Sequence, residues 1–256
     1  MSEETKDNFE KGIFWELYLD LETQFKNFLE YVPYLPGNEN TYSFKLLNLI
    51  LSIGGHVDSA FKEMARYPKF SGDEKCKKIL ELLKKSKEDI EKGKGPKFPS
   101  IKHYLETFDK LHLARFDKVA RAYVSDELSK MKVIFKRLPE REDVIPFNPY
   151  NRRTKAPEWW EIYNGLKHDV SLNIEKANLK NTRDALAGAF LLNVIHEPAF
   201  RRLFEFGILK LESYGGIGTI ARESWVSPEY LEQDIRKGIS TPYFVETPLF
   251  IYKYLQ

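Results

Sequence analysis

The chain has 256 residues, enough for one large domain or two small ones. Its residues are 42% hydrophobic and 14% aromatic, which is ample for a core and argues against disorder. A net charge of +2, from 40 basic and 38 acidic residues, excludes a uniformly basic nucleic-acid coat but not a local basic groove.

The single cysteine, Cys76, excludes an intramolecular disulfide and fits a reducing compartment. The longest apolar run, near residues 46–53, is far too short to cross a bilayer, and no signal peptide is visible. We therefore expect a soluble, cytoplasmic protein that has no membrane partner.

The N-terminal half has the apolar spacing of amphipathic helices. This spacing predicts helices over residues 9–31, 41–67, 73–91 and 100–113. The second helix has Thr41 or Ser43 as its cap, and Gly54-Gly55 interrupts it, which indicates a kink or a tight contact between helices.

The middle of the chain is less regular. Residues 133–135 suit a short strand and residues 126–131 suit a helix, while 138–157 are rich in Pro, Asn and charge and are expected to form a loop. Arg152 and Arg153 make this loop locally basic directly before the next predicted helix.

A dense cluster of aromatic, amide, basic and imidazole groups follows the loop. Pro157 suits the first turn of a helix. In that helix one face carries Trp160, Asn164, Lys167 and His168, and the adjoining face packs inward through Trp159, Ile162, Tyr163 and Leu166. Gly165 costs such a helix about 1 kcal/mol relative to Ala, which indicates a close approach to its backbone.

The helical face suggests two roles. His168 can exchange a proton near neutral pH, Lys167 and Asn164 can hold an anionic or amide group, and Trp160 can offer a stacking plane. The alternative is a buried polar network in which His168 and Asn164 satisfy each other and cap neighbouring helices.

The C-terminal part begins with an Ala-rich apolar helix predicted over residues 177–196. A further helical piece is expected over 200–211, and the tail from 228 to 256 is expected to add irregular structure or short strands. The predicted fold is mainly α, an up-and-down helical bundle over residues 1–197, with an irregular insertion that could carry short strands and an extension over 198–256 packed on the bundle.

The motif Trp159-Trp160-x-x-Tyr163-Asn164-x-x-Lys167-His168-Asp169, followed by Ala177-Asn178-Leu179-x-Asn181, resembles a signature of uncharacterised prokaryotic proteins. That group is in turn similar to the HEPN superfamily of helical-bundle proteins. The resemblance covers residues 159–192. It implies an α-helical bundle, often a dimer, that acts in defence, toxin–antitoxin or RNA-processing settings.

Active members of that superfamily are metal-independent ribonucleases, which use an Arg, a polar residue and a His four to six positions further on. His168 matches the histidine, but Glu161, Ile162 and Tyr163 stand where the Arg is expected. We therefore expect either a ribonuclease or a binding or regulatory module without turnover, and no cofactor or metal. The expected partners are RNA or a nucleotide and a second copy of the chain.

For the ribonuclease the candidate catalytic residues are His168, Lys167 and Asn164. The candidate substrate-binding residues are Trp160, Tyr163, Asp169, Arg152 and Arg153. The non-catalytic module uses the same helix and predicts that His168 is shielded from solvent. A metal-dependent hydrolase is a third hypothesis and needs His168 and Asp169 to meet His56, Asp58 and Glu63 in space, although the sequence has no HExxH pair.

Overall fold

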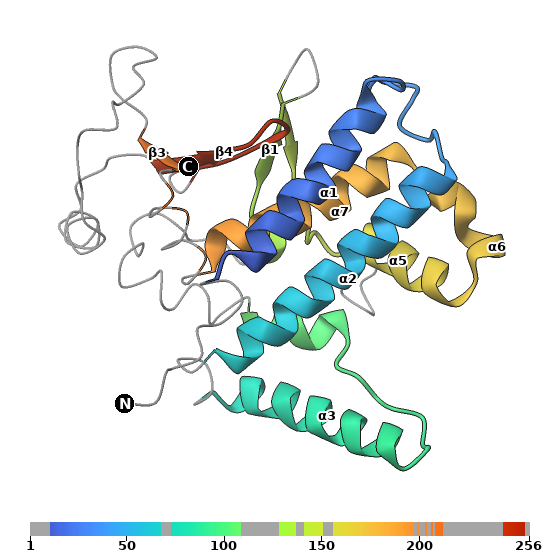
Figure 1. The fold of residues 1–256 in the computed structure, drawn as a ribbon, viewed down its shortest axis with the longest axis vertical. Helices are drawn as coiled ribbons and strands as arrows, with labels where there is room; N and C mark the ends of the chain where they lie inside the picture. The colour runs from blue at the N-terminus through green and yellow to red at the C-terminus, as the bar shows by residue number, and fades with distance from the viewer. Residues whose placement is uncertain are drawn as a thin grey trace.

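The computed structural model describes residues 11–67, 73–108, 128–136, 141–150, 156–196, 199, 203, 206, 208–211 and 243–253. It is mainly helical, with a small antiparallel sheet (Figure 1). This confirms the predicted mainly-α class and the short strands. Within the described residues, none of the helices combines the length and apolar composition needed to span a bilayer.

The N-terminal helices begin and end close to their predicted limits. They are α1 (Ile13–Leu29), α2 (Phe44–Arg66) and α3 (Glu74–Glu91), and residues 101–108 are also helical. Ser43 Oγ accepts a hydrogen bond from Leu46 N at 3.1 Å, and Asp73 Oδ1 accepts one from Lys75 N at 2.7 Å. Caps of this kind each stabilise a helix by about 1 kcal/mol, which explains why these helices begin where the sequence indicates.

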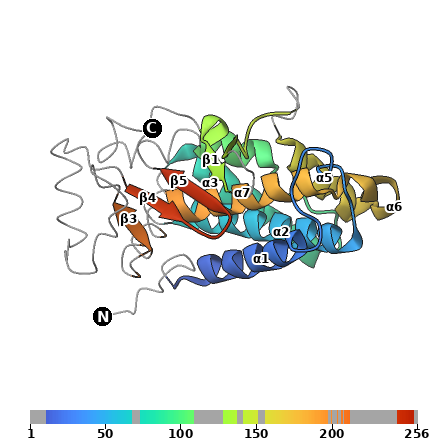
Figure 2. The same cartoon turned by 90° about the horizontal axis from the view of Figure 1, so that it is seen from above.

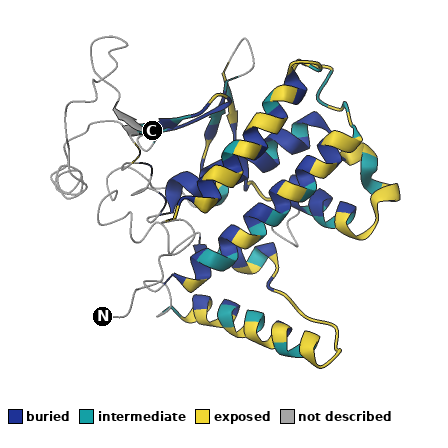
Figure 3. Cartoon of the chain, in the orientation of Figure 1, coloured by how far each residue is buried: buried dark blue, intermediate teal, exposed yellow. Residues whose placement is uncertain are grey.

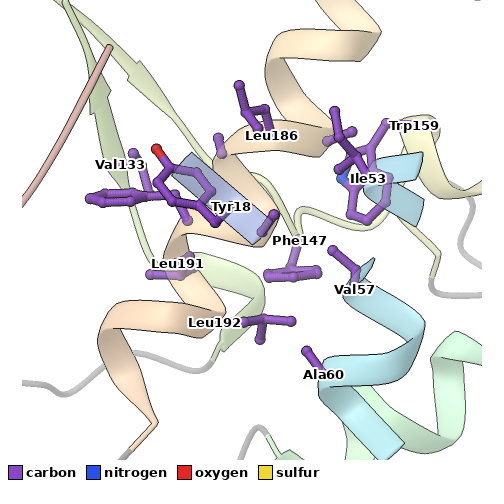
Figure 4. Packing of buried hydrophobic residues seen from close by; sticks show 14 of the residues in the cluster. Tyr18, Ile53, Val57, Ala60, Val133, Phe147, Trp159, Leu186, Leu191 and Leu192 are labelled. Atoms are coloured by element: carbon purple, nitrogen blue, oxygen red, sulfur yellow. The ribbon is translucent and has the colours of Figure 1, made fainter. Parts of the chain in front are cut away.

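The second group of helices comprises α5 (Glu158–His168), the short α6 (Val170–Asn173), the 3-10 turn η2 (Ile174–Lys176) and α7 (Leu179–Ile195). Helix α7 is buried nearly all round, and it packs against α1, α2 and α5 (Figures 1 and 2). Side chains from α1, α2, α5, α7 and β1 interdigitate in the core (Figure 4).

The sheet joins two distant segments of the chain. Its strands are β1 (Val133–Phe135), β2 (Glu142–Val144), β3 (Leu209–Leu211), β4 (Tyr243–Glu246) and β5 (Phe250–Lys253), in the spatial order β2-β1-β5-β4-β3, and the 3-10 turn η1 (Leu128–Lys130) precedes β1. Ile134 pairs with Ile251, so a strand near the C-terminus completes a sheet begun by the insertion. Helix α7 contacts β5 on this sheet.

Two sequence predictions are corrected by this sheet. The predicted loop 138–157 contains β2, because its residues 142–144 pair with β1. The predicted helical piece 200–211 ends in β3, where residues 209–211 pair with β4. Both corrections have the same reason, since a three-residue strand is set by its partner strand rather than by local periodicity.

Candidate functional site

Helix α5 is held in the core by its aromatic residues. Trp159 Nε1 donates a hydrogen bond to the Pro146 carbonyl at 2.6 Å, and its ring lies close to Gly188 on α7. A Cβ added at Gly188 would lie 3.1 Å from Trp159 Cζ2, so the small residue allows α5 to pack closely against α7. Trp159 therefore fixes the N-terminal half of α5 against α7.

Tyr163 fixes the other half of α5 against α2. Its ring lies directly over Gly54, where an added Cβ would be within 2.6 Å of three ring atoms. Gly54 thus marks a tight contact between helices, which is one of the two alternatives predicted from the glycine pair, and α2 continues through the pair without the predicted interruption. Burial, and then the negative charge of Asp58, raise the pKa of the Tyr163 hydroxyl.

The C-terminal end of α5 faces solvent. Lys167 and His168 are exposed and Asn164 is half-buried. The Lys167 Nζ lies 5.8 Å from the centroid of the Tyr163 ring. In the part of the chain that the structure describes, neither Lys167 nor His168 has an ion-pair or hydrogen-bond partner for its side chain. We call Asn164, Lys167 and His168 the α5 surface.

The exposure of His168 corrects one sequence hypothesis. In the non-catalytic alternative, His168 is buried and pairs with Asn164, whereas the structure leaves it exposed at the end of α5. A buried histidine–asparagine pair does exist elsewhere: Asn193 Nδ2 on α7 lies 3.2 Å from His56 Nε2 on α2. Burial lowers the pKa of His56 to about 4, so this histidine is neutral near pH 7.

The aromatic and acidic residues predicted to bind substrate lie in other surroundings. Trp160 is only 5% exposed and Tyr163 only 6%, so neither offers a free stacking plane in this structure. The Asp169 carboxylate caps α6 by accepting hydrogen bonds from Ser171 Oγ at 2.7 Å and Leu172 N at 3.2 Å. These hydrogen bonds lower the pKa of Asp169. Arg152 and Arg153 lie outside the described residues.

Gly165 is approached by a side chain of the same chain. An added Cβ at Gly165 would lie 3.1 Å from the Asn173 amide, which donates a hydrogen bond to the Asp169 carbonyl at 2.9 Å. The close approach predicted from this glycine is therefore made by Asn173 of α6, which folds back on α5. It shapes the solvent-facing end of the helix next to His168.

The residues that the metal-dependent hydrolase would need do not come together in the structure. Among the residues that the structure describes, no three His, Cys, Asp or Glu side chains lie close enough to share one ion. His56 is buried between α2 and α7, whereas His168 and Asp169 are exposed. The geometry therefore brings no support to the metal-dependent hydrolase.

Two buried charged groups were not singled out from the sequence. Arg183 on α7 is 5% exposed, and it binds Glu142 on β2 at 2.6 Å and Asp184 at 2.7 Å. Glu22 on α1 is 2% exposed and accepts hydrogen bonds from Thr247 Oγ1 and Leu249 N. Glu22 stands in an apolar row four residues after Tyr18 and three before Phe25, so its position was a usable sequence signal.

The chain matches no protein-family model, no curated protein and no solved structure at a significant level.

Proposed function

We propose that the α5 surface binds RNA and that His168 acts there as a general acid/base in metal-independent cleavage. The observation that carries the proposal is the exposure of Lys167 and His168 side by side, with no partner for either side chain among the described residues. An unpaired lysine attracts phosphate, and an exposed imidazole can exchange protons with a bound ligand.

The rigidity of α5 supports this role. Its buried Trp159, Trp160 and Tyr163 hold the helix against α7 and α2, so the groups at its end are presented from a fixed scaffold. Catalytic groups act best when they lose little freedom on binding. Lys167 and His168 also lie at the C-terminal end of α5, where the helix dipole favours positive charge.

In the proposed reaction, His168 takes the proton of a ribose 2′-hydroxyl. The 2′-oxygen attacks the neighbouring phosphorus, and the bond to the 5′-oxygen breaks. The products are a 2′,3′-cyclic phosphate and a 5′-hydroxyl, which takes its proton from solvent. Lys167 stabilises the negative charge that develops on the phosphate oxygens, and Asn164 can donate a hydrogen bond to the same group.

The HEPN-like fold and signature are part of this proposal. The mainly helical architecture is compatible with an up-and-down bundle of that kind, and residues 159–192 carry the signature. The position of the superfamily's Arg is not filled, and Lys167 takes over its role in the proposal. A second copy of the chain remains the expected partner, and the mass in solution by light scattering tests it.

The competing function is RNA binding without cleavage, as in a regulatory module. Incubation of a labelled single-stranded RNA with the protein in EDTA separates the two. We expect cleavage by the wild type with cyclic-phosphate ends detected by mass spectrometry. His168→Ala should abolish cleavage while leaving RNA affinity within a small factor.

Lys167→Ala should weaken RNA binding, and Lys85→Ala is its charge-matched control because Lys85 is exposed on α3. RNA binding without cleavage by the wild type would support the regulatory module instead. If the His168 and Lys167 variants keep both RNA binding and cleavage, with unchanged unfolding midpoints, the proposed site is wrong.

A further inference from the structure

The connection between α3 and the helix at 101–108 is unusually basic. Residues 92–100 contain three lysines and no Asp or Glu, a formal charge of +3 in a chain whose total is +2. Residues 92–98 are all exposed (Figure 3). They include Phe98, whose side chain is 53% exposed. We call residues 92–98 the basic segment.

Two of these lysines have no anionic partner. Lys92 pairs with Glu88 at 3.9 Å. In contrast, Lys94 and Lys97 form no ion pair with any residue that the structure describes. Unneutralised lysines next to an exposed aromatic ring are the features that bind the phosphates and bases of a single strand.

The basic segment is held in a defined position. Ser86 Oγ donates a hydrogen bond to the Lys97 carbonyl at 2.7 Å, and Lys94 N donates one to the Asp89 carbonyl at 2.7 Å. Gly93 has a φ of 68°, which lets the chain leave α3 in a tight turn. Its lysines therefore project from an ordered backbone, which lowers the entropy lost on binding.

A series of contacts along α2 connects the basic segment with the α5 surface. Lys167 lies over Tyr163, and Tyr163 packs on Gly54. Two turns further along α2, Lys62 pairs with Asp58 and lies 5.5 Å from the centroid of the Phe98 ring.

Lys62 lies eight positions after Gly54 in the helix, a rise of about 12 Å. Helices α3 and α5 both pack against α2, on the side opposite α1 (Figures 1 and 2). One extended strand is long enough to contact both ends of this stretch.

We infer that the basic segment is a second contact for the RNA proposed at α5, and that the RNA is single-stranded. Phosphates of the strand bind Lys94 and Lys97, and an unpaired base stacks on Phe98. In a duplex the bases are paired and their faces covered, so this contact selects against double strands. The inference rests on the proposed function of the α5 surface, because that surface fixes the position of the other end of the strand.

The experiment measures the affinity of the full chain for a fluorescent single-stranded oligouridine of about 12 nucleotides, a length within the range of known single-strand sites. Fluorescence anisotropy is recorded over a series of salt concentrations. The labelled strand carries 2′-deoxy nucleotides, which lack the attacking hydroxyl, so it is not cleaved during the measurement. The variants are Lys94→Ala/Lys97→Ala and, as matched control, Lys84→Ala/Lys85→Ala. All four lysines are exposed, and the two double variants change the net charge equally.

The affinity falls as salt rises, and removing two phosphate contacts should make the slope of log affinity against log salt shallower by about 1.4. We expect this change in Lys94→Ala/Lys97→Ala and a clearly smaller one in Lys84→Ala/Lys85→Ala. Phe98→Ala should weaken the binding of the single strand and leave the affinity for a duplex of the same length unchanged. Equal effects of the two lysine pairs would overturn the inference, since they would show only a general charge effect.

The outcomes also separate the two proposals. If Lys167→Ala weakens binding and Lys94→Ala/Lys97→Ala does not, the second contact is wrong and the proposed function stands. If the wild type does not bind the strand, both fail. If Lys94→Ala/Lys97→Ala loses binding to phosphatidylserine vesicles but keeps its affinity for RNA, the basic segment is a membrane contact and the inference is wrong.

Discussion

The ring of Tyr163 on α5 lies against the backbone of Gly54 on α2, where no larger residue fits. An added Cβ at Gly54 would be within 2.6 Å of three atoms of the ring, whereas one at the adjacent Gly55 would meet nothing within 4 Å. Two neighbouring glycines of one helix thus have opposite surroundings. The contact determines how closely the helix that carries Lys167 and His168 approaches α2.

This difference predicts opposite effects of the same substitution at the two glycines. Gly54→Ala should destabilise the protein by about 1–3 kcal/mol, because the methyl group overpacks the contact with Tyr163. Gly55→Ala should stabilise it by up to about 1 kcal/mol, because Ala favours the helix and has room. Urea unfolding of both variants measures the difference, and equal effects at the two positions would contradict the close packing of α5 on α2.

The buried His56 predicts a loss of stability in acid. Its pKa is lowered to about 4 by burial, below the ordinary value of 6.5, so the unfolded chain binds a proton at a pH at which the folded one does not. The contribution of His56 is complete above pH 6.5 and is lost as the pH falls toward 4. At about pH 5 the loss should be about 2 kcal/mol.

His56→Gln tests this contribution, because glutamine can still pair with Asn193 but does not titrate. We expect the free energy of unfolding of the variant to depend less on pH than that of the wild type between pH 6.5 and 4. Denaturant titrations of both proteins across this window measure the two slopes. Parallel curves would show that His56 is not buried as the structure has it.

Glu22 predicts a pH dependence of the opposite sign. Burial raises the pKa of its carboxyl group, although the hydrogen bonds from Thr247 and Leu249 partly oppose the shift. The folded state therefore binds this proton more tightly, and the contribution of Glu22 is complete below the ordinary pKa of 4.5 and is lost as the pH rises through the folded value.

Glu22→Gln keeps the shape of the side chain and cannot ionise. The stability of the variant relative to the wild type should increase as the pH rises from acid to neutral, which denaturant titrations at several pH values measure. Glu16→Gln is the matched control, because that carboxylate is exposed on the same helix. A relative loss of stability in Glu22→Gln with rising pH would mean that the carboxylate is stabilised in the fold.

Arg183 predicts a large effect of a substitution that conserves charge. Its guanidinium binds Glu142 and Asp184 through separate nitrogens and lies 5.0 Å from the centroid of the Tyr34 ring. Lysine cannot make the two planar contacts or the stacking, so Arg183→Lys should destabilise the protein by about 2–3 kcal/mol.

Arg66→Lys provides the comparison for Arg183→Lys. Arg66 is 59% exposed and pairs with Glu63 at 3.4 Å, so its replacement should change stability by less than about 0.5 kcal/mol. Thermal unfolding of the two variants measures both effects. A similar small change in Arg183→Lys would show that the β2–α7 ion pair does not hold the sheet to the helices.

Helix limits and the short strand at 133–135 were predictable because they depend on near neighbours. Ser43, Asp73 and Asn178 each cap a helix through a backbone group two or three residues away, and apolar residues recur at helical spacing inside those limits. A close contact at the glycine pair of α2 was one of the two predicted alternatives, since glycine inside a helix is otherwise unfavourable, but the sequence did not distinguish it from a kink.

The candidate site was predicted only in part. The sequence placed Lys167 and His168 on one helix, and the structure leaves both exposed, but it buries Trp160 and uses Asp169 as a cap. Helical spacing alone could not tell which of these side chains would be exposed and which buried, because Trp160 lies on the boundary between the two faces of the helix. Its burial depends on which helices pack on either side of α5.

Local features followed from the sequence alone: the positions of the helices, the cap of α2 and the residues that share a helical face. The pairing of His56 with Asn193, of Glu22 with Thr247 and of β1 with β5 depends instead on the tertiary structure. These contacts join residues more than a hundred positions apart, and many alternative partners are compatible with the same local pattern. The choice among them is made by packing of the whole core, which no window of the sequence contains.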